Sequence, residues 1–281
     1  MSSVLSVNNL CKEYPKFQLK DVSFNVEKGS IMGLIGRNGA GKTTTLKALM
    51  NFIHPSAGDI AFFGMTMKGH ENEIKQRIGY ATGGIHYYQR KKIKDIIGIT
   101  KLFYENWDDA LYSHYLHVFN LDEEKKLQDL SEGMKVKFNL TMALSHHAEF
   151  LILDEPTSGL DPVSREELLE IFLDLAQKGV TILFSTHITA DLEKCADSIT
   201  YIKKGKVFAS EKSDTFTSNY KLVSMCESLT SAQREKILGI CKNKNGSTGL
   251  IKSEDEALFN KEEISSPDLD TIMIHLEKEG L

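Results

Sequence analysis

The run GRNGAGKTT at residues 36–44 constrains the fold of this chain more than any other feature. It follows an apolar segment at 30–35 and precedes a helix-forming segment at 46–50. The spacing G-x-x-x-x-G-K-[ST] is typical of a phosphate-binding loop. Flexible glycines, here Gly36 and Gly41, let backbone N–H groups turn toward phosphate oxygens at the positive end of a helix. The sequence therefore predicts a strand, a phosphate-binding loop and a helix, in that order.

Side chains of this loop are expected to complete the phosphate site. Lys42 would add a point charge beside the β and γ phosphates, and Thr43 would offer its hydroxyl to a Mg²⁺ ion. Small residues at 39–41 keep the loop uncrowded. The residues predicted to contact the nucleotide here are Gly36, Arg37, Asn38, Gly39, Ala40, Gly41, Lys42, Thr43 and Thr44.

The composition fits a soluble globular protein that can bury a sizeable core, with 281 residues, 41% of them hydrophobic and 26% charged. We expect no membrane span, because no apolar run approaches the roughly eighteen residues that one requires. We also expect no secretory signal, because the first residues lack its basic and apolar regions. A formal charge of −5 leaves no basic footprint for nucleic acid. The four cysteines are scattered, which favours reduced thiols.

The order of predicted elements indicates an α/β fold. Apolar segments at 5–10 and 22–26 predict an antiparallel β edge before the phosphate loop. Residues from about 93 to 145 have a helical pattern and many aromatic side chains, which indicates a helical insertion. Strand and helix patterns then alternate, which favours a mostly parallel sheet covered on both faces. These later elements are a strand at 150–153, a helix at 162–178, a strand at 181–185, a helix at 190–196 and a strand at 198–202.

The chain changes character near residue 213. From there to residue 281 it is polar and acidic, with a strand-like segment at 220–225, a helix-like segment at 231–238 and a final amphipathic helix from Pro267. We therefore predict two domains, a nucleotide-binding domain at 1–212 and a small accessory α+β domain at 213–281.

Two carboxylates follow the apolar strand at 150–153. A buried strand in such a sheet carries the residues at its C-terminal edge toward the ligand. Asp154 would hold Mg²⁺ through water, and Glu155 would polarise the attacking water of a hydrolase. Two acids after an apolar run could also be a strand end that meets a solvated turn, but their coexistence with the phosphate-binding loop favours the catalytic interpretation.

Five motifs occur in a particular order along the chain. After the phosphate-binding loop come LSEGM at 130–134, which heads a helical pattern, the LILDE strand, SGLD at 158–161 and STH at 185–187. This order resembles the ATP-binding cassette of ABC transporters over residues 4–212. The resemblance implies a P-loop NTPase fold, with a mostly parallel core sheet and an antiparallel β edge. It also implies ATP and Mg²⁺ as ligands and ATP hydrolysis as the activity.

The resemblance assigns roles that spacing alone does not. It implies that Tyr14 stacks on adenine, and that Ser131 and Gly133 contact the γ-phosphate of ATP bound to another subunit. Asp161 matches a residue that communicates across a cassette dimer, and His187 matches the histidine that orients water and the γ-phosphate. Taken alone, Ser131 would also serve as a helix cap, and a single histidine at a strand end is more often structural.

Cassettes of this family close head to tail around two ATP molecules. Because this chain carries each half-site once, the resemblance implies a homodimer or a heterodimer with a second cassette. It further implies a separate multispanning permease as partner, and a location on the cytoplasmic face of the membrane.

Some positions depart from the family pattern. A glutamine usually follows the Ile-Gly-Tyr strand, but Gly83 stands there, and Gln89 comes six residues too late to replace it. In the signature, Glu132 replaces the first glycine and Met134 replaces the terminal glutamine. These departures affect the expected rate of turnover and the coupling to the membrane domain more than ATP binding. They also allow an active dimer of two different cassettes, in which the second cassette supplies the stronger signature.

Further sequence segments indicate the subfamily that the chain resembles. FYENWD at 103–108, the LSEGMK signature and LSHH at 144–147 resemble the cassettes of Gram-positive exporters for antimicrobial or amphipathic peptides, of the phenol-soluble modulin type. Two alternatives remain: an ATP-sensing regulatory module with weak hydrolysis, and a non-transport ABC protein acting on ribosomes or DNA. The second alternative usually needs two cassettes in one chain, a long coiled coil or a basic linker, and the sequence has none of these.

Overall fold

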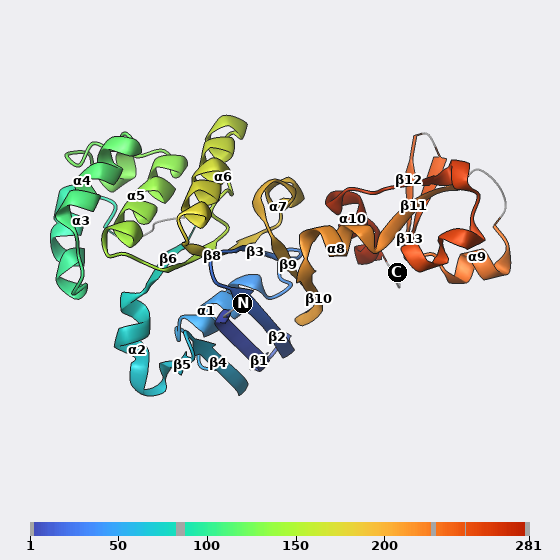
Figure 1. Cartoon of the computed structure of the whole chain (residues 1–281), viewed down its shortest axis with the longest axis horizontal. Helices are drawn as coiled ribbons and strands as arrows, with labels where there is room; N and C mark the ends of the chain where they lie inside the picture. Colours follow the sequence, from blue (N-terminus) through green and yellow to red (C-terminus); the bar gives the residue numbers. More distant parts are fainter. Residues whose placement is uncertain (1–2, 83–87, 226–228, 245, 279–281) are drawn as a thin grey trace. The chain divides into compact units, whose positions relative to one another are not determined.

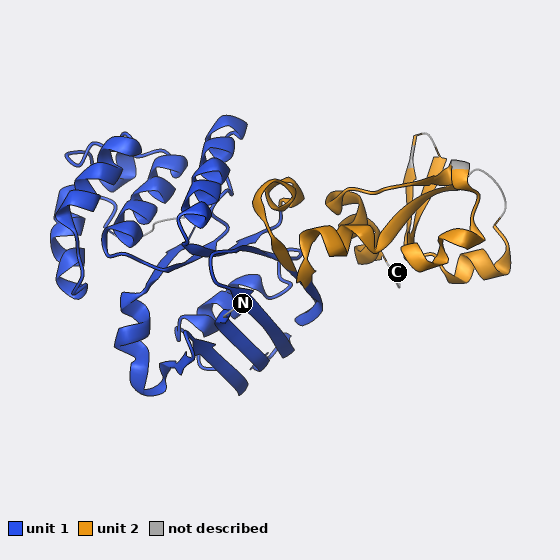
Figure 2. Ribbon diagram, viewed as in Figure 1, with its two compact units in different colours: residues 1–187, 200–210 blue, residues 188–199, 211–281 orange. Residues whose placement is uncertain are grey.

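The computed structural model describes residues 3–82, 88–225, 229–244 and 246–278 (Figure 1). Within these ranges the chain forms two compact units, one of residues 1–187 and 200–210 and one of residues 188–199 and 211–281 (Figure 2). The domain boundary predicted between residues 212 and 213 lies close to the division between residues 210 and 211. The second unit also takes in 188–199, which the sequence pattern attributes to the nucleotide-binding domain.

The core sheet of the first unit has the strand order β10-β9-β3-β8-β7-β6. Strands β3, β8, β7 and β6 run parallel, with Leu34 opposite Ser185 and Asp154 also opposite Ser185. Their C-terminal ends therefore meet at one edge. The strands are β3 (Ile31–Ile35), β6 (Ile78–Thr82), β7 (Phe150–Asp154), β8 (Thr181–Thr186), β9 (Ser198–Lys203) and β10 (Lys206–Lys212).

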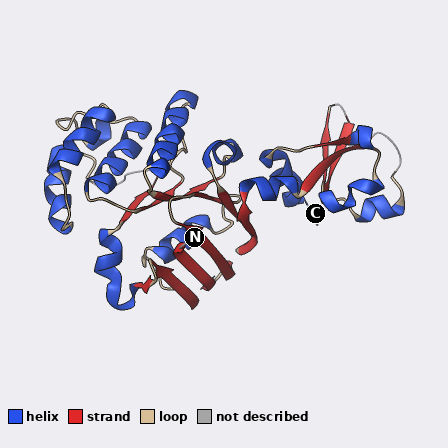
Figure 3. Ribbon diagram, viewed as in Figure 1, coloured by secondary structure: helices blue, strands red, loops and turns tan. Residues whose placement is uncertain are grey.

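The central strands are apolar because both of their faces are covered. Every residue of β3, β7 and β8 is buried, as a parallel sheet between two helical layers requires. Helix α1 (Lys42–Leu49) contacts β7, and helix α6 (Pro162–Gln177) contacts β3 and β8 (Figure 3). This arrangement confirms the predicted α/β P-loop fold.

A second sheet of the first unit is antiparallel, in the order β2-β1-β4-β5. Along β2, buried and exposed side chains alternate over much of the strand, which is the pattern of a sheet with one face in the core. Its core residues pack in one apolar cluster with those of β3 and α1. The strands are β1 (Ser3–Tyr14), β2 (Phe17–Glu27), β4 (Ala57–Phe62) and β5 (Met65–Thr66).

Helices precede and follow β6 in the sequence. Helix α2 (Met67–Gln76), which has non-helical backbone angles at 68–70, precedes that strand. Between β6 and β7 the described residues form α3 (Ile93–Thr100), α4 (Asp109–Val118) and α5 (Glu132–Ser145). Helix α5 contacts both α4 and β6. The predicted helical insertion thus corresponds to α3, α4 and α5.

The second unit has its own sheet, in the order β12-β13-β11-β14. Val223, Ile251 and Phe259 form a small buried cluster within it, and α10 buries Leu269 and Ile272. The strands are β11 (Tyr220–Met225), β12 (Ile240–Asn243), β13 (Gly246–Lys252) and β14 (Ile264–Ser265), and the helices are α7 (Thr189–Cys195), α8 (Ser213–Ser218), α9 (Ser231–Glu235) and α10 (Leu269–Lys278).

Candidate functional site

The phosphate-binding loop joins β3 to α1, as predicted, and two of its glycines leave no space for a side chain. A Cβ atom on Gly36 would collide with the backbone carbonyl of Ile202. Gly41 has a φ of 120°, and its Cβ would come within 2.5 Å of Leu19 Cδ2. Glycine adopts such a left-handed conformation without the steric cost that other residues incur. Both positions therefore require glycine for the loop to fit against its neighbours.

Lys42 begins α1 and is held inside the site. Its side chain is only 5% exposed, and Nζ donates a hydrogen bond of 2.7 Å to the carbonyl oxygen of Gly36. Nζ also lies 3.2 Å from Glu155 Oε1. A buried ammonium group is costly without such partners, so these contacts fix the position of a cation beside the loop.

Asp154, at the end of β7, accepts hydrogen bonds from two hydroxyl groups. Ser185 Oγ donates to its Oδ1 at 2.6 Å, and Thr43 Oγ1 donates to the same oxygen at 3.2 Å. A carboxylate and a hydroxyl are hard oxygen ligands of the kind that Mg²⁺ takes, together with phosphate oxygens and water. No cluster of three or more His, Cys, Asp or Glu side chains suited to a metal occurs in the described residues. Asp154 and Thr43 therefore fit a cation that completes its coordination with a bound nucleotide.

Glu155 connects the loop to the neighbouring strand. Its backbone N–H donates to Ser185 Oγ at 3.0 Å, and its φ is 52°, a conformation that is uncommon outside glycine. Strained backbone of this kind is often found at functional sites. The side chain is 23% exposed and bridges two groups, because Oε1 faces Lys42 and Oε2 lies 2.7 Å from His187 Nδ1.

His187 follows directly after β8 and is 43% exposed. Since a carboxylate only accepts hydrogen bonds, its contact with Glu155 requires the proton on Nδ1. Lys42, Glu155 and His187 come from three different segments, and the parallel strands bring them to one edge of the sheet. The structure thus assembles a cation, a carboxylate and an imidazole around the phosphate-binding loop.

A cleft of about 580 Å³ opens over this arrangement. The predicted residues that line it are Arg37, Asn38, Gly39, Gly41, Lys42, Thr43, Thr44, Glu155 and His187. Lys16, Phe17 and Ser158 line it as well, although none of the three was among the predicted site residues; Ser158 begins the SGLD motif. Tyr14 is 43% exposed and stands opposite Phe17 across the turn between β1 and β2. It is not among the described residues that line the cleft.

The N-terminus of α5 carries the signature residues. Ser131 caps the helix by accepting a hydrogen bond of 3.3 Å from the backbone N–H of Met134. The Glu132 carboxylate forms an ion pair of 2.7 Å with Lys135 of the same helix. Gly133 faces α6, where an added Cβ would lie 3.6 Å from Ser164 Cβ. The cap confirms that Ser131 begins a helix, while its predicted contact with nucleotide stays a prediction.

Asp161 caps α6. It accepts hydrogen bonds of 3.0 Å from the backbone N–H groups of Val163 and Ser164, and the Ser164 hydroxyl donates to it at 2.6 Å. These bonds from Ser164 and Val163 hold the pKa of the Asp161 carboxyl below its ordinary value. Among the described residues, those lining the cleft do not include Ser131, Gly133 or Asp161. Within one chain, the predicted contacts at Ser131, Gly133 and Asp161 are therefore separate from those of the phosphate-binding loop.

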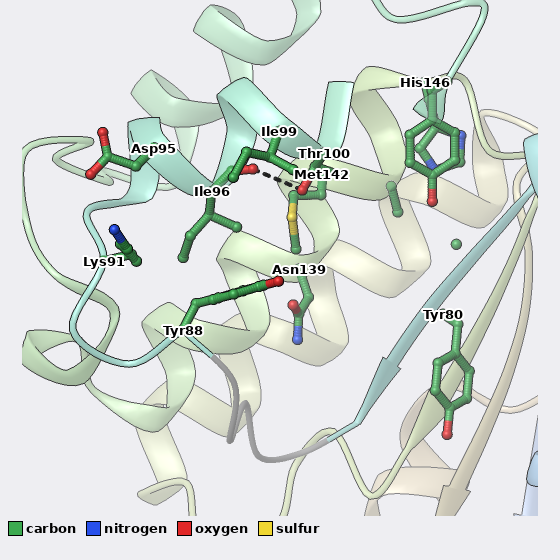
Figure 4. Close-up of a pocket in the computed structure, with 13 residues that line it drawn as sticks. Tyr80, Tyr88, Lys91, Asp95, Ile96, Ile99, Thr100, Asn139, Met142 and His146 are labelled. Atoms are coloured by element: carbon green, nitrogen blue, oxygen red, sulfur yellow. Dashed lines mark hydrogen bonds between the residues drawn. The ribbon is translucent and has the colours of Figure 1, made fainter. Parts of the chain in front are cut away.

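Gly83, which stands where the family pattern has a glutamine, lies outside the described residues. A groove of about 230 Å³ nevertheless lies beside the strand that precedes it, lined by side chains from β6, α3 and α5 (Figure 4). Tyr104 stacks on His146 at the end of this groove, with ring centroids 3.8 Å apart. Burial lowers the pKa of His146 to about 4 and raises that of Tyr80 to about 12, where the charge of Asp154 adds to the effect. Both groups are therefore neutral at pH 7.

In the described part of the chain, helices are too short or too polar to cross a membrane.

Comparisons with known proteins agree with this geometry. A model of the ABC transporter family matches residues 19–158. The chain is 35% identical over 218 residues to the bacitracin transport ATP-binding protein BcrA of Bacillus licheniformis, which covers 74% of this chain and 69% of BcrA. It is 33% identical over 186 residues to the ABC transporter ATP-binding protein YtrB of Bacillus subtilis, over 66% of this chain. That match spans 63% of YtrB, less than two thirds of its length.

Solved structures give the same result. A structure described as the ATP-binding subunit of an ABC transporter superposes with a TM-score of 0.69 at 30% identity, covering 76% of this chain and 91% of the other. A nucleotide-free ATP-binding cassette superposes with a TM-score of 0.67 at 21% identity, over 76% of this chain and 94% of the other, and supports the fold alone. With the phosphate-binding loop, the strand-end carboxylates and these matches together, the chain belongs to the ATP-binding subunits of ABC transporters, a family of ATPases.

Proposed function

We propose that this chain hydrolyses ATP to power a membrane exporter of antimicrobial or amphipathic peptides. The observation that carries the proposal is the Glu155 carboxylate, which lies between Lys42 and His187 at the mouth of the phosphate-binding loop. In this position Glu155 would accept a proton from the attacking water, and His187 would orient that water and the γ-phosphate. Asp154 and Thr43 would hold Mg²⁺, which supplies charge stabilisation to the phosphates when bound.

The peptide class rests on likeness to relatives. Bacitracin transport ATP-binding proteins of Bacillus licheniformis and Enterococcus faecalis are 35% and 31% identical to the matched region. Bacitracin is named as the cargo of those proteins. For this chain we propose the broader class of amphipathic peptides, and the test is peptide export from cells that lack the chain and its permease, compared with cells that regain both. Peptide release that does not depend on the chain would contradict the assignment.

We further propose that the active unit contains two cassettes. Ser131 and Gly133 stand apart from the cleft of their own chain, so a second cassette would bring its signature helix to the nucleotide. The Glu132 carboxylate is paired with Lys135 of its own helix, which reduces its repulsion of phosphate. The partner is a second copy or a different cassette with a stronger signature. Full cooperative ATPase activity of the purified chain alone would exclude the asymmetric form.

Replacing Ser131 by Asp is expected to separate helix capping from nucleotide contact. Aspartate and asparagine both cap helices about as well as serine, so α5 should remain intact in Ser131→Asp and Ser131→Asn. The added negative charge would repel the γ-phosphate across the dimer and lower ATP-dependent dimerisation and hydrolysis by about tenfold to a hundredfold. Sedimentation with and without ATP, beside a steady-state ATPase assay, measures both effects. Equal behaviour of the two variants would contradict the intersubunit contact.

A separate permease would dock in the groove between β6, α3 and α5. Apolar side chains stand exposed on and beside it, including Ile99 at 56% and Phe103 at 72%. Lys91 and Asp95 supply charges in the lining of the groove, and the neutral Tyr80 and His146 add none at pH 7. These features suit a short apolar segment of a membrane protein, and they support a position of the chain on the inner face of the membrane.

Ile99→Glu is expected to weaken the permease interaction without unfolding the chain. Its side chain is more than half exposed, so the substitution costs little stability, but a charge in the groove must be desolvated on docking. Stimulation of the ATPase by the permease should fall about tenfold, a loss of roughly 1.4 kcal/mol, while basal hydrolysis stays unchanged. Val118→Glu on α4, also exposed and outside the groove, is the matched control. If both variants keep full stimulation, docking occurs elsewhere.

A further inference from the structure

Two segments of the helical insertion, residues 89–94 and 123–128, form a short antiparallel ribbon. Lys92 stands directly opposite Lys126 in an antiparallel bridge. Backbone hydrogen bonds of 3.0 Å on both sides of the bridge hold this register, from Ile93 N–H to the Lys125 carbonyl and from Leu127 N–H to the Lys91 carbonyl. The backbone therefore determines which of these residues lie opposite each other.

The ribbon is anchored to the core on one side. Ile93 and Leu127, next to the bridge on each segment, are both fully buried. A two-stranded ribbon is marginally stable by itself in water, so this apolar pair holds it in place. The two residues of an antiparallel pair point to the same side, and successive residues point to opposite sides. Lys92 and Lys126 therefore share the outer side of the ribbon, where like charges directly opposite each other are destabilising.

A single carboxylate offsets part of this positive charge. Glu124 pairs with Lys92 at 2.8 Å and with Lys94 at 2.5 Å. Hydrogen bonds from both lysines lower the pKa of Glu124 to about 2, so it is ionised at pH 7. No carboxylate among the described residues pairs with Lys126. One anion thus serves two lysines, and the third lysine on this side has no partner of opposite charge within that part of the chain.

The ribbon as a whole is basic in an acidic chain. It carries six basic and two acidic side chains, whereas the formal net charge of the chain is −5. The second acid, Glu123, is half-buried and accepts a hydrogen bond of 2.9 Å from the Tyr112 hydroxyl. Three flanking aspartates, at 95, 122 and 129, reduce the positive charge around the ribbon but do not belong to it. The basic residues are Arg90, Lys91, Lys92, Lys94, Lys125 and Lys126.

Lys91 belongs both to the ribbon and to the groove beside β6 (Figure 4). The ribbon therefore borders the groove in which we place the permease. A membrane protein bound in the groove brings the ribbon close to the bilayer, and this step rests on the proposed function. We propose that the outer side of the ribbon binds the anionic phospholipid headgroups of the inner leaflet. Headgroup phosphates supply the negative charge that Lys126 lacks in the chain itself.

Charge favours lipid over protein as the partner of the ribbon. Cytoplasmic loops of membrane proteins carry an excess of Lys and Arg, so they repel a basic ribbon. The anionic leaflet attracts Lys and Arg that come within a Debye length of it. Because the chain as a whole is negative, the leaflet attracts it only in orientations that turn the ribbon to the membrane. The lipid contact thus orients the chain beside its permease.

Lys126→Glu is expected to weaken lipid binding without weakening the fold. The new carboxylate lies opposite Lys92 and replaces a repulsive pair by an attractive one, so thermal stability should be unchanged or higher. Binding of the full chain to vesicles of phosphatidylglycerol and phosphatidylcholine should fall about five- to thirtyfold, because the ribbon loses two units of positive charge. Co-sedimentation with the vesicles measures this change. Salt at roughly 1 M should abolish binding of the unmodified chain.

Lys28→Glu is the matched control, because it changes the net charge equally at an exposed position in the turn between β2 and β3. It should retain most of the vesicle binding, and vesicles of phosphatidylcholine alone should bind neither variant. Equal losses in the two variants, or no preference of the unmodified chain for anionic vesicles, would overturn the proposal. Binding to polyglutamate without binding to anionic vesicles would also overturn it and would indicate an acidic protein segment as the partner.

The vesicles contain no permease, so their binding is measured independently of the groove. If the chain binds anionic vesicles through the ribbon but Ile99→Glu keeps full stimulation by the permease, the proposed docking in the groove fails and the lipid contact stands. If Ile99→Glu loses stimulation but Lys126→Glu binds vesicles as the unmodified chain does, the lipid contact fails instead.

Discussion

Glu155→Gln is expected to abolish ATP turnover while ATP stays bound. Glutamine has the same shape, but it cannot take a proton from water, so loss of the general base should lower kcat by about a hundredfold to ten-thousandfold. The phosphate-binding loop and Lys42 remain, and removal of the Glu155 charge also removes a competitor of phosphate for the Lys42 ammonium, now 3.2 Å away. We therefore expect ATP to hold two cassettes together in a long-lived dimer.

Steady-state ATPase activity and size-exclusion chromatography with Mg²⁺ and ATP measure the two effects separately. Glu149→Gln is the matched control, because Glu149 also belongs to an ion pair, at 2.6 Å from Arg77, but it lies at the opposite end of β7. It should leave turnover unchanged. Equal activity of Glu155→Gln and the unmodified chain would favour the alternative of an ATP-sensing module with weak hydrolysis.

The phosphate-binding loop could be predicted because its chemistry depends on adjacent residues. The glycines, Lys42 and Thr43 are contiguous, and a strand before them and a helix after them are visible as local patterns. Asp154 and Glu155 follow from the same logic, since an apolar strand leads to its own C-terminal edge. The register that places Ser185 opposite Asp154 could not be predicted in this way, because neighbouring parallel strands can pair in several registers.

Other features depend on the register of two strands or on partners far away in the sequence. Phe17 and Lys16 line the cleft because a tight turn pairs Tyr14 with Phe17, and periodicity does not determine that register. The antiparallel pairing could have identified Phe17 as a candidate beside Tyr14. Similarly, the sequence pattern of α7 predicts only one more helix in the alternation of strands and helices. Its attachment to α10 joins Thr189 to a residue 81 positions later, and no local pattern records such a contact.

Lys42→Ala is expected to weaken ATP binding strongly. The Lys42 side chain is 5% exposed, and the Gly36 carbonyl holds its ammonium group at 2.7 Å, so the cation is already fixed beside the phosphate-binding loop. Charge-assisted hydrogen bonds of this kind contribute more than neutral ones, and loss of one should lower ATP affinity by about ten- to a hundredfold. Isothermal titration calorimetry with ATP and Mg²⁺ measures this change directly.

Lys47→Ala is the matched control for that experiment. Lys47 lies on the same helix, α1, but its side chain is exposed, so its removal changes net charge equally without touching the cleft. If net charge alone governed the affinity, both variants would weaken ATP binding by the same small factor, which salt would screen. A large loss confined to Lys42→Ala would assign the effect to the fixed cation beside the loop. Unchanged affinity in Lys42→Ala would contradict the role of Lys42 in phosphate binding.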